Sequence, residues 1–242
     1  MFEKLNPENY YDDYRGRDLS LLYGRMKGMD LPRELLDSIR EKEAARFLIL
    51  GSAVTDNLNQ VALIDQYLRP GKVENDEVVV IDRNEYPVSR HKKESDWIEG
   101  ADSWTNTPKS TLEFSYPKFH IAQADMRHLP FAENGFDAVI SDYTFNYLDN
   151  IEDVEKTFLE ISQALPDNGL LVISVMGNEK FPYSGEADSE SFGAELQNKD
   201  QGGVEVYFFP LQAYINLARK HGLYLAKYDL IGNDMCAVLV KK

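Results

Sequence analysis

The sequence is poor in the residues that build disulfides and metal centres. It contains one cysteine, Cys236, and four histidines in 242 residues. A single cysteine excludes an internal disulfide, and the scattered histidines offer no ligand cluster for a structural metal. We therefore expect a cytoplasmic protein without a metal, in which Cys236 fills part of the core.

Long apolar runs and an excess of positive charge are also missing. No run approaches the roughly 18 apolar residues of a transmembrane helix, and the first residues lack the apolar centre of a secretory signal. Lysine and arginine number 26 against 41 aspartates and glutamates, a formal net charge of −15. Such a charge repels nucleic-acid phosphates and anionic lipids, so we expect neither nucleic acid nor a membrane as a partner.

Short apolar runs that alternate with helical patterns are what the sequence does have. Five of them have the pattern of strands buried on both faces of a parallel sheet, and four of the five are followed by a glycine or a polar residue. These runs are residues 47–50, 78–81, 119–122, 136–140 and 170–175. The last two predicted strands, 223–230 and 235–240, are joined by a link too short for a parallel crossover and must form a hairpin. The pattern predicts an α/β fold, with a doubly wound, Rossmann-like sheet of seven strands that is mostly parallel and has an antiparallel C-terminal strand.

The helices are predicted from apolar residues three and four positions apart. One covers residues 32–45 and is expected to be capped by Asp30. Another carries its apolar face at 58–68, a third follows the capping residue Asn150, and a fourth spans 210–221.

Two units are expected along the chain. Residues 1–45 are predicted to form a helical N-terminal cap, and residues 46–242 the α/β domain. Polar stretches at about 83–118 and 177–203 have poor periodicity and are interpreted as insertions into that domain.

Ligands of such sheets bind outside the carboxyl ends of the strands, near the switch in strand order. An acidic residue after the second strand, here Asp82, can accept both hydroxyls of a ribose. A glycine after the first strand, here Gly51, allows a tight turn and a close approach of the backbone to a ligand. Taken alone, Asp82 is compatible with a strand-end cap and Gly51 with a simple turn, but their position at one sheet edge favours a binding site.

Two segments resemble the class I S-adenosylmethionine-dependent methyltransferases. Residues 124–131 (ADMRHLPF) and 134–141 (NGFDAVIS) resemble the D-x-x-x-L-P-F … F-D-x-V-x-S segment of that family. Residues 165–174 (LPDNGLLVIS) are similar to its L-K-P-G-G turn and fifth strand. The closing helix and hairpin match the family's tail, in which the last strand runs antiparallel. The resemblance extends from Phe47 to Lys242 and implies that S-adenosylmethionine is the cofactor and S-adenosylhomocysteine the product.

The resemblance also implies a set of cofactor-binding residues. The set is Gly51, Ser52, Ala53, Asp82, Arg83, Asp125, Met126, Ser141, Asp142 and Tyr143. Gly51 stands at the first glycine of the loop around the methionine part of the cofactor. Asp82 would take the ribose hydroxyls, and Asp125 would accept from the adenine amino group, with the backbone of Met126 beside the ring. Residues 141–143 would line the floor near the sulfonium and the methyl acceptor.

The glycine-rich loop departs from the family's h-D-h-G-x-G-x-G pattern. Ile49, Ala53 and Thr55 stand where the family has an acid, a glycine and a glycine. Ile49 removes a carboxylate that can approach the cofactor's ammonium group, and Thr55 resists a positive φ. We therefore expect S-adenosylmethionine to bind more loosely here than in relatives with the full loop.

Three functions remain open from the sequence. The first is methyl transfer from S-adenosylmethionine to an unidentified small-molecule acceptor, for which the protein must mainly align the reacting atoms. The second is a non-catalytic binding or regulatory protein of the same fold, which the altered loop suggests. The third, a nicotinamide-dependent oxidoreductase, is disfavoured by the antiparallel tail and by the lack of G-x-G-x-x-G after Leu50. The sequence names no catalytic residue, no acceptor and no oligomeric state.

Overall fold

The computed structural model describes residues 26, 28–51, 60, 63–84, 118–177, 193–197, 204–231 and 234–242. Most of the expected N-terminal cap, most of the insertion at 83–118 and much of the one at 177–203 lie outside these residues, as do Ser52 and Ala53. Within the described segments, no helix combines the length and the apolar character needed to cross a bilayer.

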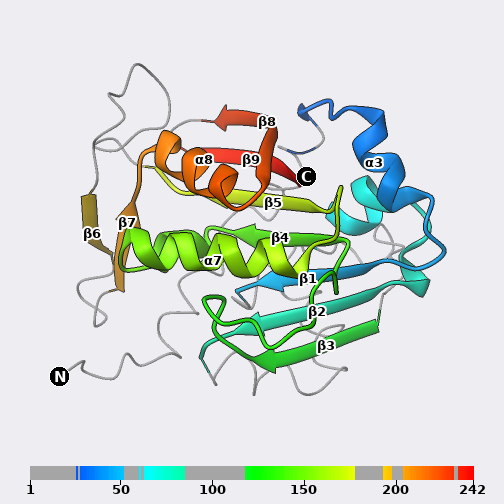
Figure 1. The fold of residues 1–242 in the computed structure, drawn as a ribbon, viewed down its shortest axis with the longest axis horizontal. Coiled ribbons are helices and arrows are strands. Elements are labelled where there is room, and N and C mark those ends of the chain that lie inside the picture. Colours follow the sequence, from blue (N-terminus) through cyan, green and yellow to red (C-terminus); the bar gives the residue numbers. More distant parts are fainter. Residues whose placement is uncertain are drawn as a thin grey trace, which may run out of the picture.

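A seven-stranded sheet forms the centre of the molecule (Figure 1). Its strands are β1 (Arg46–Leu50), β2 (Glu77–Asp82), β3 (Lys118–Gln123), β4 (Ala138–Asp142), β5 (Leu170–Val175), β8 (Leu223–Ile231) and β9 (Asp234–Lys241). They lie in the order β3-β2-β1-β4-β5-β9-β8. Strands β1 to β5 pair in parallel, whereas β9 is antiparallel to both β5 and β8. The predicted doubly wound sheet with an antiparallel C-terminal strand is confirmed.

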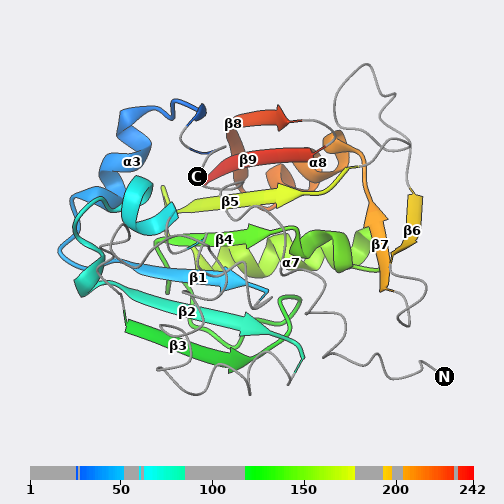
Figure 2. The same cartoon turned by 180° about the vertical axis from the view of Figure 1, so that it is seen from behind.

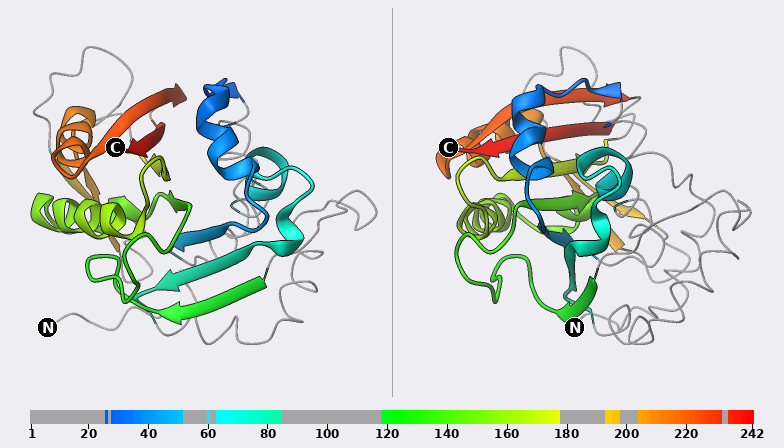
Figure 3. Two further views of the ribbon diagram at one scale, coloured as in Figure 1. Left: turned by 45° about the vertical axis from the view of Figure 1, so that its right-hand side comes forward. Right: turned by 90° about the vertical axis from the view of Figure 1, so that its right-hand side faces the viewer.

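Each face of the sheet buries its own apolar core. Helices α7 (Ile151–Ala164) and α8 (Leu211–Lys220) cover one face. Helix α3 (Arg33–Arg40) and a π-helical turn at Ile64–Leu68 pack on the other, and Figures 2 and 3 show the sheet between the two layers. Successive residues of β1 alternate between the two cores, which explains why the central strands are continuous apolar runs. Cys236 is fully buried in the second core, as expected.

Asn150 caps α7 as predicted, since its side chain accepts a 2.8 Å hydrogen bond from the backbone N–H of Asp153. The prediction for α3 was wrong in two respects. Its N-cap is Pro32, which makes no side-chain capping bond, and Asp30 has a positive φ of 42° instead of capping the helix. The helix also ends at Arg40, five residues earlier than expected.

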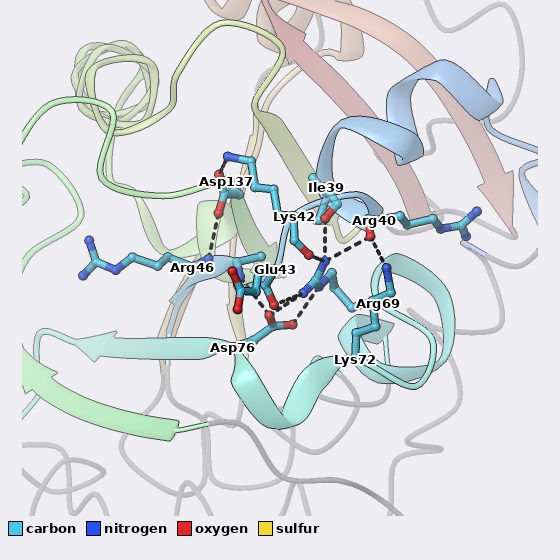
Figure 4. A network of polar contacts seen from close by, with 10 residues as sticks. Ile39, Arg40, Lys42, Glu43, Arg46, Arg69, Lys72, Asp76 and Asp137 are labelled. Atoms are coloured by element: carbon cyan, nitrogen blue, oxygen red, sulfur yellow. Dashed lines mark hydrogen bonds and ion pairs between the residues drawn. The ribbon is translucent and has the colours of Figure 1, made fainter.

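The early end of α3 has a physical cause, which Figure 4 shows. The backbone carbonyls of Ile39 and Lys42 accept hydrogen bonds from Nη1 of Arg69, at 2.8 and 2.6 Å. The carbonyl of Arg40 also accepts from Nη1, at 3.2 Å, and that of Glu43 accepts from Nη2 at 3.3 Å. The last carbonyls of a helix lack partners within it, so Arg69 satisfies these groups where the chain leaves α3.

The charge of Arg69 is balanced by Asp76, and both side chains are completely buried. Nε of Arg69 bonds to Oδ2 of Asp76 at 3.0 Å and Nη2 bonds to Oδ1 at 2.9 Å. Oδ1 also accepts from the backbone N–H of Ala45 at 2.8 Å. Ala45 precedes β1 and Asp76 precedes β2, so the buried ion pair joins α3 to the amino ends of these two strands.

One strand boundary needs correction, and the stretch interpreted as an insertion at 177–203 contains a strand. This strand, β6 (Gly193–Gln197), pairs antiparallel with β7 (Val204–Phe208). The fourth strand was predicted to begin at Phe136 and begins at Ala138. Phe136 instead donates its backbone N–H to the carbonyl of Ala164 at 3.0 Å, and its ring packs edge-on against that of Phe131.

Candidate functional site

The candidate residues that the structure describes gather at the carboxyl edge of the sheet. Leu50 is in register with Ile81 of β2 and with Ser141 of β4, so the residues that follow them are neighbours. The backbone N–H of Gly51 bonds to the carbonyl of Ile81 at 2.9 Å. That of Ala124 bonds to the carbonyl of Asp82 at 2.9 Å, which brings the turn after β3 to the same edge.

Gly51 occupies a position where a side chain does not fit. Its φ is +84°, in the region that glycine tolerates and other residues avoid. A Cβ atom there would lie 2.4 Å from Oγ1 of Thr144. That hydroxyl donates a 2.7 Å hydrogen bond to the carbonyl of Leu50, which holds it in place. Both the positive φ and the contact with Thr144 therefore require glycine at position 51. The role of Thr144 was not predicted from the sequence.

The floor predicted at 141–143 is tied to the ends of two other strands. The hydroxyl of Tyr143 donates to Oδ2 of Asp234 at 2.8 Å, and Oδ1 of Asp234 accepts from the backbone N–H of Gly177 at 3.0 Å. Asp142 accepts a hydrogen bond from the hydroxyl of Ser174. Tyr143 has a φ of +54°, a strained conformation for a bulky residue. The ends of β4, β5 and β9 thus form one hydrogen-bonded unit.

Asn146 connects this unit to β7. Its side chain is fully buried and donates to the carbonyls of Met176, at 3.0 Å, and Tyr207, at 2.9 Å. It also accepts from the backbone N–H of Met176 at 2.7 Å. One amide side chain therefore fixes the chain after β5 and the strand β7 against the turn after β4.

Asp125 is held by a neighbour in its own turn. The backbone N–H and Nε of Arg127 each donate to Oδ1 of Asp125 at 2.9 Å, and Nη2 donates to Oδ2 at 2.6 Å. This hydrogen bonding lowers the pKa of the Asp125 carboxyl group below its ordinary value, and the charge of Arg83 acts in the same direction. Nη1 of Arg127 bonds to Oδ2 of Asp153 on α7 at 2.8 Å. The carboxylate is therefore ionised at neutral pH and fixed in orientation.

A family model described as a methyltransferase domain matches residues 64–173, which include β2 to β5 and the Asp125 turn. The sheet has the class I methyltransferase fold. The match identifies the chain as an enzyme of the methyltransferase type, with S-adenosylmethionine as its cofactor.

Solved structures share the fold of this methyltransferase at low sequence identity. An S-adenosylmethionine-dependent methyltransferase from Methanosarcina mazei has a TM-score of 0.59 and 12% identity, over 88% of this chain and 98% of the other. A protein from Listeria monocytogenes described as a candidate S-adenosylmethionine-dependent methyltransferase has a TM-score of 0.56 and 13% identity, over 90% and 96%. The glycopeptide N-methyltransferase MtfA in complex with S-adenosylmethionine has a TM-score of 0.54 and 10% identity, over 82% and 87%. A search of curated proteins finds no match.

The described residues of this methyltransferase fit the adenosine part of the cofactor. A carboxylate offers about four acceptor positions. Arg127 directs three N–H hydrogens at Asp125, and its Nε–H is shared between Oδ1 at 2.9 Å and Oδ2 at 3.1 Å. The carboxylate, which is 31% exposed, therefore has room for a fourth donor. In the region predicted to lie near the sulfonium, Ser141 at the end of β4 has a completely buried hydroxyl that finds no hydrogen-bond partner within the described segments. A buried polar atom of this kind is expected where a ligand or water completes the site.

The methionine part fits less well at one position. Ile49, which stands where the family has an acid, is fully buried in the core beneath α3 and pairs with Val80 and Ile140. No carboxylate can therefore approach the cofactor's ammonium group from this position. Among the described residues, no group of three His, Cys, Asp or Glu is placed to hold a metal ion.

Proposed function

We propose that this methyltransferase moves the methyl group of S-adenosylmethionine to a small-molecule acceptor, with the cofactor lying across the carboxyl ends of β1 to β4. The main support for the proposal is that Gly51, Asp82 and Asp125 lie at the same edge of the sheet. MtfA, which shares the fold, is described in complex with S-adenosylmethionine, and this supports S-adenosylmethionine as the ligand.

Each residue has a role that follows from its chemistry. Asp82 accepts the two ribose hydroxyls from its place at the end of β2, while Arg83 follows it at the rim. Asp125 accepts from the adenine amino group, and the backbone of Met126 lies beside the ring. Gly51, with Ser52 and Ala53 after it, forms the loop at the methionine part. A side chain at 51 would collide with the hydroxyl of Thr144.

The cofactor, when bound, supplies a methyl group on a positively charged sulfur, which is already a strong electrophile. The protein must then hold the acceptor atom in line with the methyl carbon and exclude water. Ser141, Asp142 and Tyr143 form the floor of this region, and the bond of the Tyr143 hydroxyl to Asp234 fixes the orientation of that side chain. A general base is needed only for an acceptor that must lose a proton.

The proposed cofactor site is tested by calorimetry with S-adenosylmethionine and S-adenosylhomocysteine. Replacing Asp82 by alanine removes the charged acceptor of the ribose hydroxyls. Hydrogen bonds to charged groups contribute about 1.5–3 kcal/mol, so the dissociation constant should rise about ten- to hundredfold. Asp167→Ala is the matched control, because Asp167 is an exposed acid in the turn before β5, at the opposite edge of the sheet. Absence of binding by the unmodified protein, or an unchanged constant in Asp82→Ala, would contradict the proposed site.

The acceptor class is tested by following a labelled methyl group. The net charge of −15 disfavours polyanionic acceptors. Incubation of the protein with S-adenosylmethionine and a cell extract should therefore place the label among small molecules. Label in nucleic acids or proteins would show that the acceptor is a macromolecule. That result would not contradict the proposed cofactor site.

A further inference from the structure

The turn after β3 is attached to α7 at two points. Arg127 reaches Asp153 in the first turn of α7, with Nη1 and Oδ2 2.8 Å apart. The backbone N–H of Leu129 donates to Oε2 of Glu160, farther along the same helix, at 2.8 Å. Both acids belong to a helix whose own start is fixed by the Asn150 cap. The turn is thus anchored on a rigid element.

The two attachments differ in what they do to Asp125. Glu160 holds only the backbone of the turn. Arg127 contacts both carboxylate oxygens of Asp125 and then extends to Asp153, whose side chain is only 9% exposed. A guanidinium group is planar and offers its donors in a fixed fork, so a carboxylate bound along one edge of it has a defined plane. The side chain of Asp125 is 31% exposed and without this contact would sample several rotamers.

We propose that Arg127 is a positioning residue for recognition of the adenine base. It orients Asp125 so that the exposed part of its carboxylate can accept from the adenine amino group, and Asp153 holds the guanidinium in place. This inference rests on the proposed cofactor site and adds to it the residue that selects the base. It makes recognition of the amino group depend on a side chain that does not touch the cofactor.

The experiment compares two ligands that differ only in the amino group: S-adenosylhomocysteine and its 6-deamino analogue, which has hydrogen in its place. Calorimetry on the full chain gives the ratio of their dissociation constants. A hydrogen bond to a charged, oriented acceptor should make the unmodified protein prefer the amino compound about ten- to hundredfold. In Arg127→Ala the ratio should fall below about threefold, because Asp125 is then free to turn away.

A purely structural role for Arg127 would weaken both ligands by the same factor and leave the ratio unchanged, and this result would overturn the proposal. Lys156→Ala is the matched control, because Nζ of Lys156 lies 3.5 Å from Oδ1 of Asp153 and makes no contact with Asp125. That variant should keep the preference of the unmodified protein.

Asp153→Asn is a second variant that preserves the shape of the anchor and removes its charge. Asp153→Asn should lower the preference for the amino compound, as Arg127→Ala does. If Arg127→Ala does not fold, Asp153→Asn is used to test the proposal instead. The failure of each idea is distinguishable. If the unmodified protein binds neither ligand, the proposed function fails. If it binds both with equal affinity, cofactor binding stands and the role of Arg127 is overturned.

Discussion

Removing either member of the buried Arg69–Asp76 pair should destabilise the fold strongly. In Arg69→Met, the Asp76 carboxylate stays buried with the Ala45 N–H as its one remaining partner among those described. In Asp76→Asn, the guanidinium keeps its carbonyl contacts and loses its counter-charge. Breaking a fully buried pair typically costs about 3–5 kcal/mol, because it leaves an uncompensated charge in the interior. We expect each single variant to lose this amount of unfolding free energy.

Urea unfolding followed by circular dichroism measures the loss. With a slope of about 3 kcal/mol per molar urea, it corresponds to a midpoint lower by about 1–2 M. The double variant Arg69→Met/Asp76→Asn removes both charges and should lose about 2–3 kcal/mol less than the sum of the single losses, since the two residues contact each other directly.

The exposed pair Arg33–Asp37 on α3 provides the control. Its atoms are 3.7 Å apart and the arginine side chain is 88% exposed, so Arg33→Met should lose only about 0.3–0.5 kcal/mol. Single losses below about 1 kcal/mol at Arg69 and Asp76, or losses that simply add in the double variant, would refute the reasoning.

Three further predictions concern the site. Gly51→Ala should lower the urea midpoint more than Gly71→Ala, because both glycines have a positive φ but only Gly51 has a neighbour, Thr144, within 4 Å of the added Cβ. Equal decreases of the midpoint in the two variants would show that backbone strain alone matters. The lowered pKa of Asp125 stabilises the fold at pH values above the pKa of an unfolded aspartate, about 3.9, and this contribution is lost as the pH falls through the pKa of the folded state. Acid should therefore lower the urea midpoint less steeply in Asp125→Asn than in the unmodified protein, and parallel pH profiles would contradict this. Asn146→Ala removes three buried hydrogen bonds and should lose about 1–3 kcal/mol or more in urea unfolding, whereas a loss under about 0.5 kcal/mol would show that the bonds are replaced.

The strands were predictable because their burial leaves a direct trace in the sequence. The run 170–175 is apolar except for Ser174, and all six residues of β5 are buried. The strand pair β6–β7 was not predicted. Residues 193–197 are few and lie in a polar stretch, so their strand forms through pairing with β7 and leaves no local pattern in the sequence. The end of α3 was missed because it is dictated by Arg69, which lies 29 positions from Arg40 in the sequence. An arginine next to Pro70-Gly71 has the local pattern of a surface turn.

The positions of Gly51, Asp82 and Asp125 at one edge followed from the alternation of strands and helices, and the structure places them there. Their assignment to particular groups of the cofactor stays a prediction. Thr144 and Asp234 were not found, because each acts through a contact with a distant segment. Arg127 offered a local signal that was overlooked: an arginine two residues after an aspartate in a tight turn can bond back to it.

The buried ion pair sits at the amino ends of β1 and β2, whereas the candidate site lies at their carboxyl ends. Asp137, before β4, adds to the same amino-end scaffold by accepting from the backbone N–H of Arg46 at 2.8 Å and by pairing with Lys42. Mutations in the loop that follows β1 therefore leave these anchors untouched. Lineages of such a protein can exchange loop residues, and with them ligand preference, without first acquiring compensating stability. For the engineer, the amino edge is the place to leave alone, and substitutions at the carboxyl edge should spare Gly51 and Asn146.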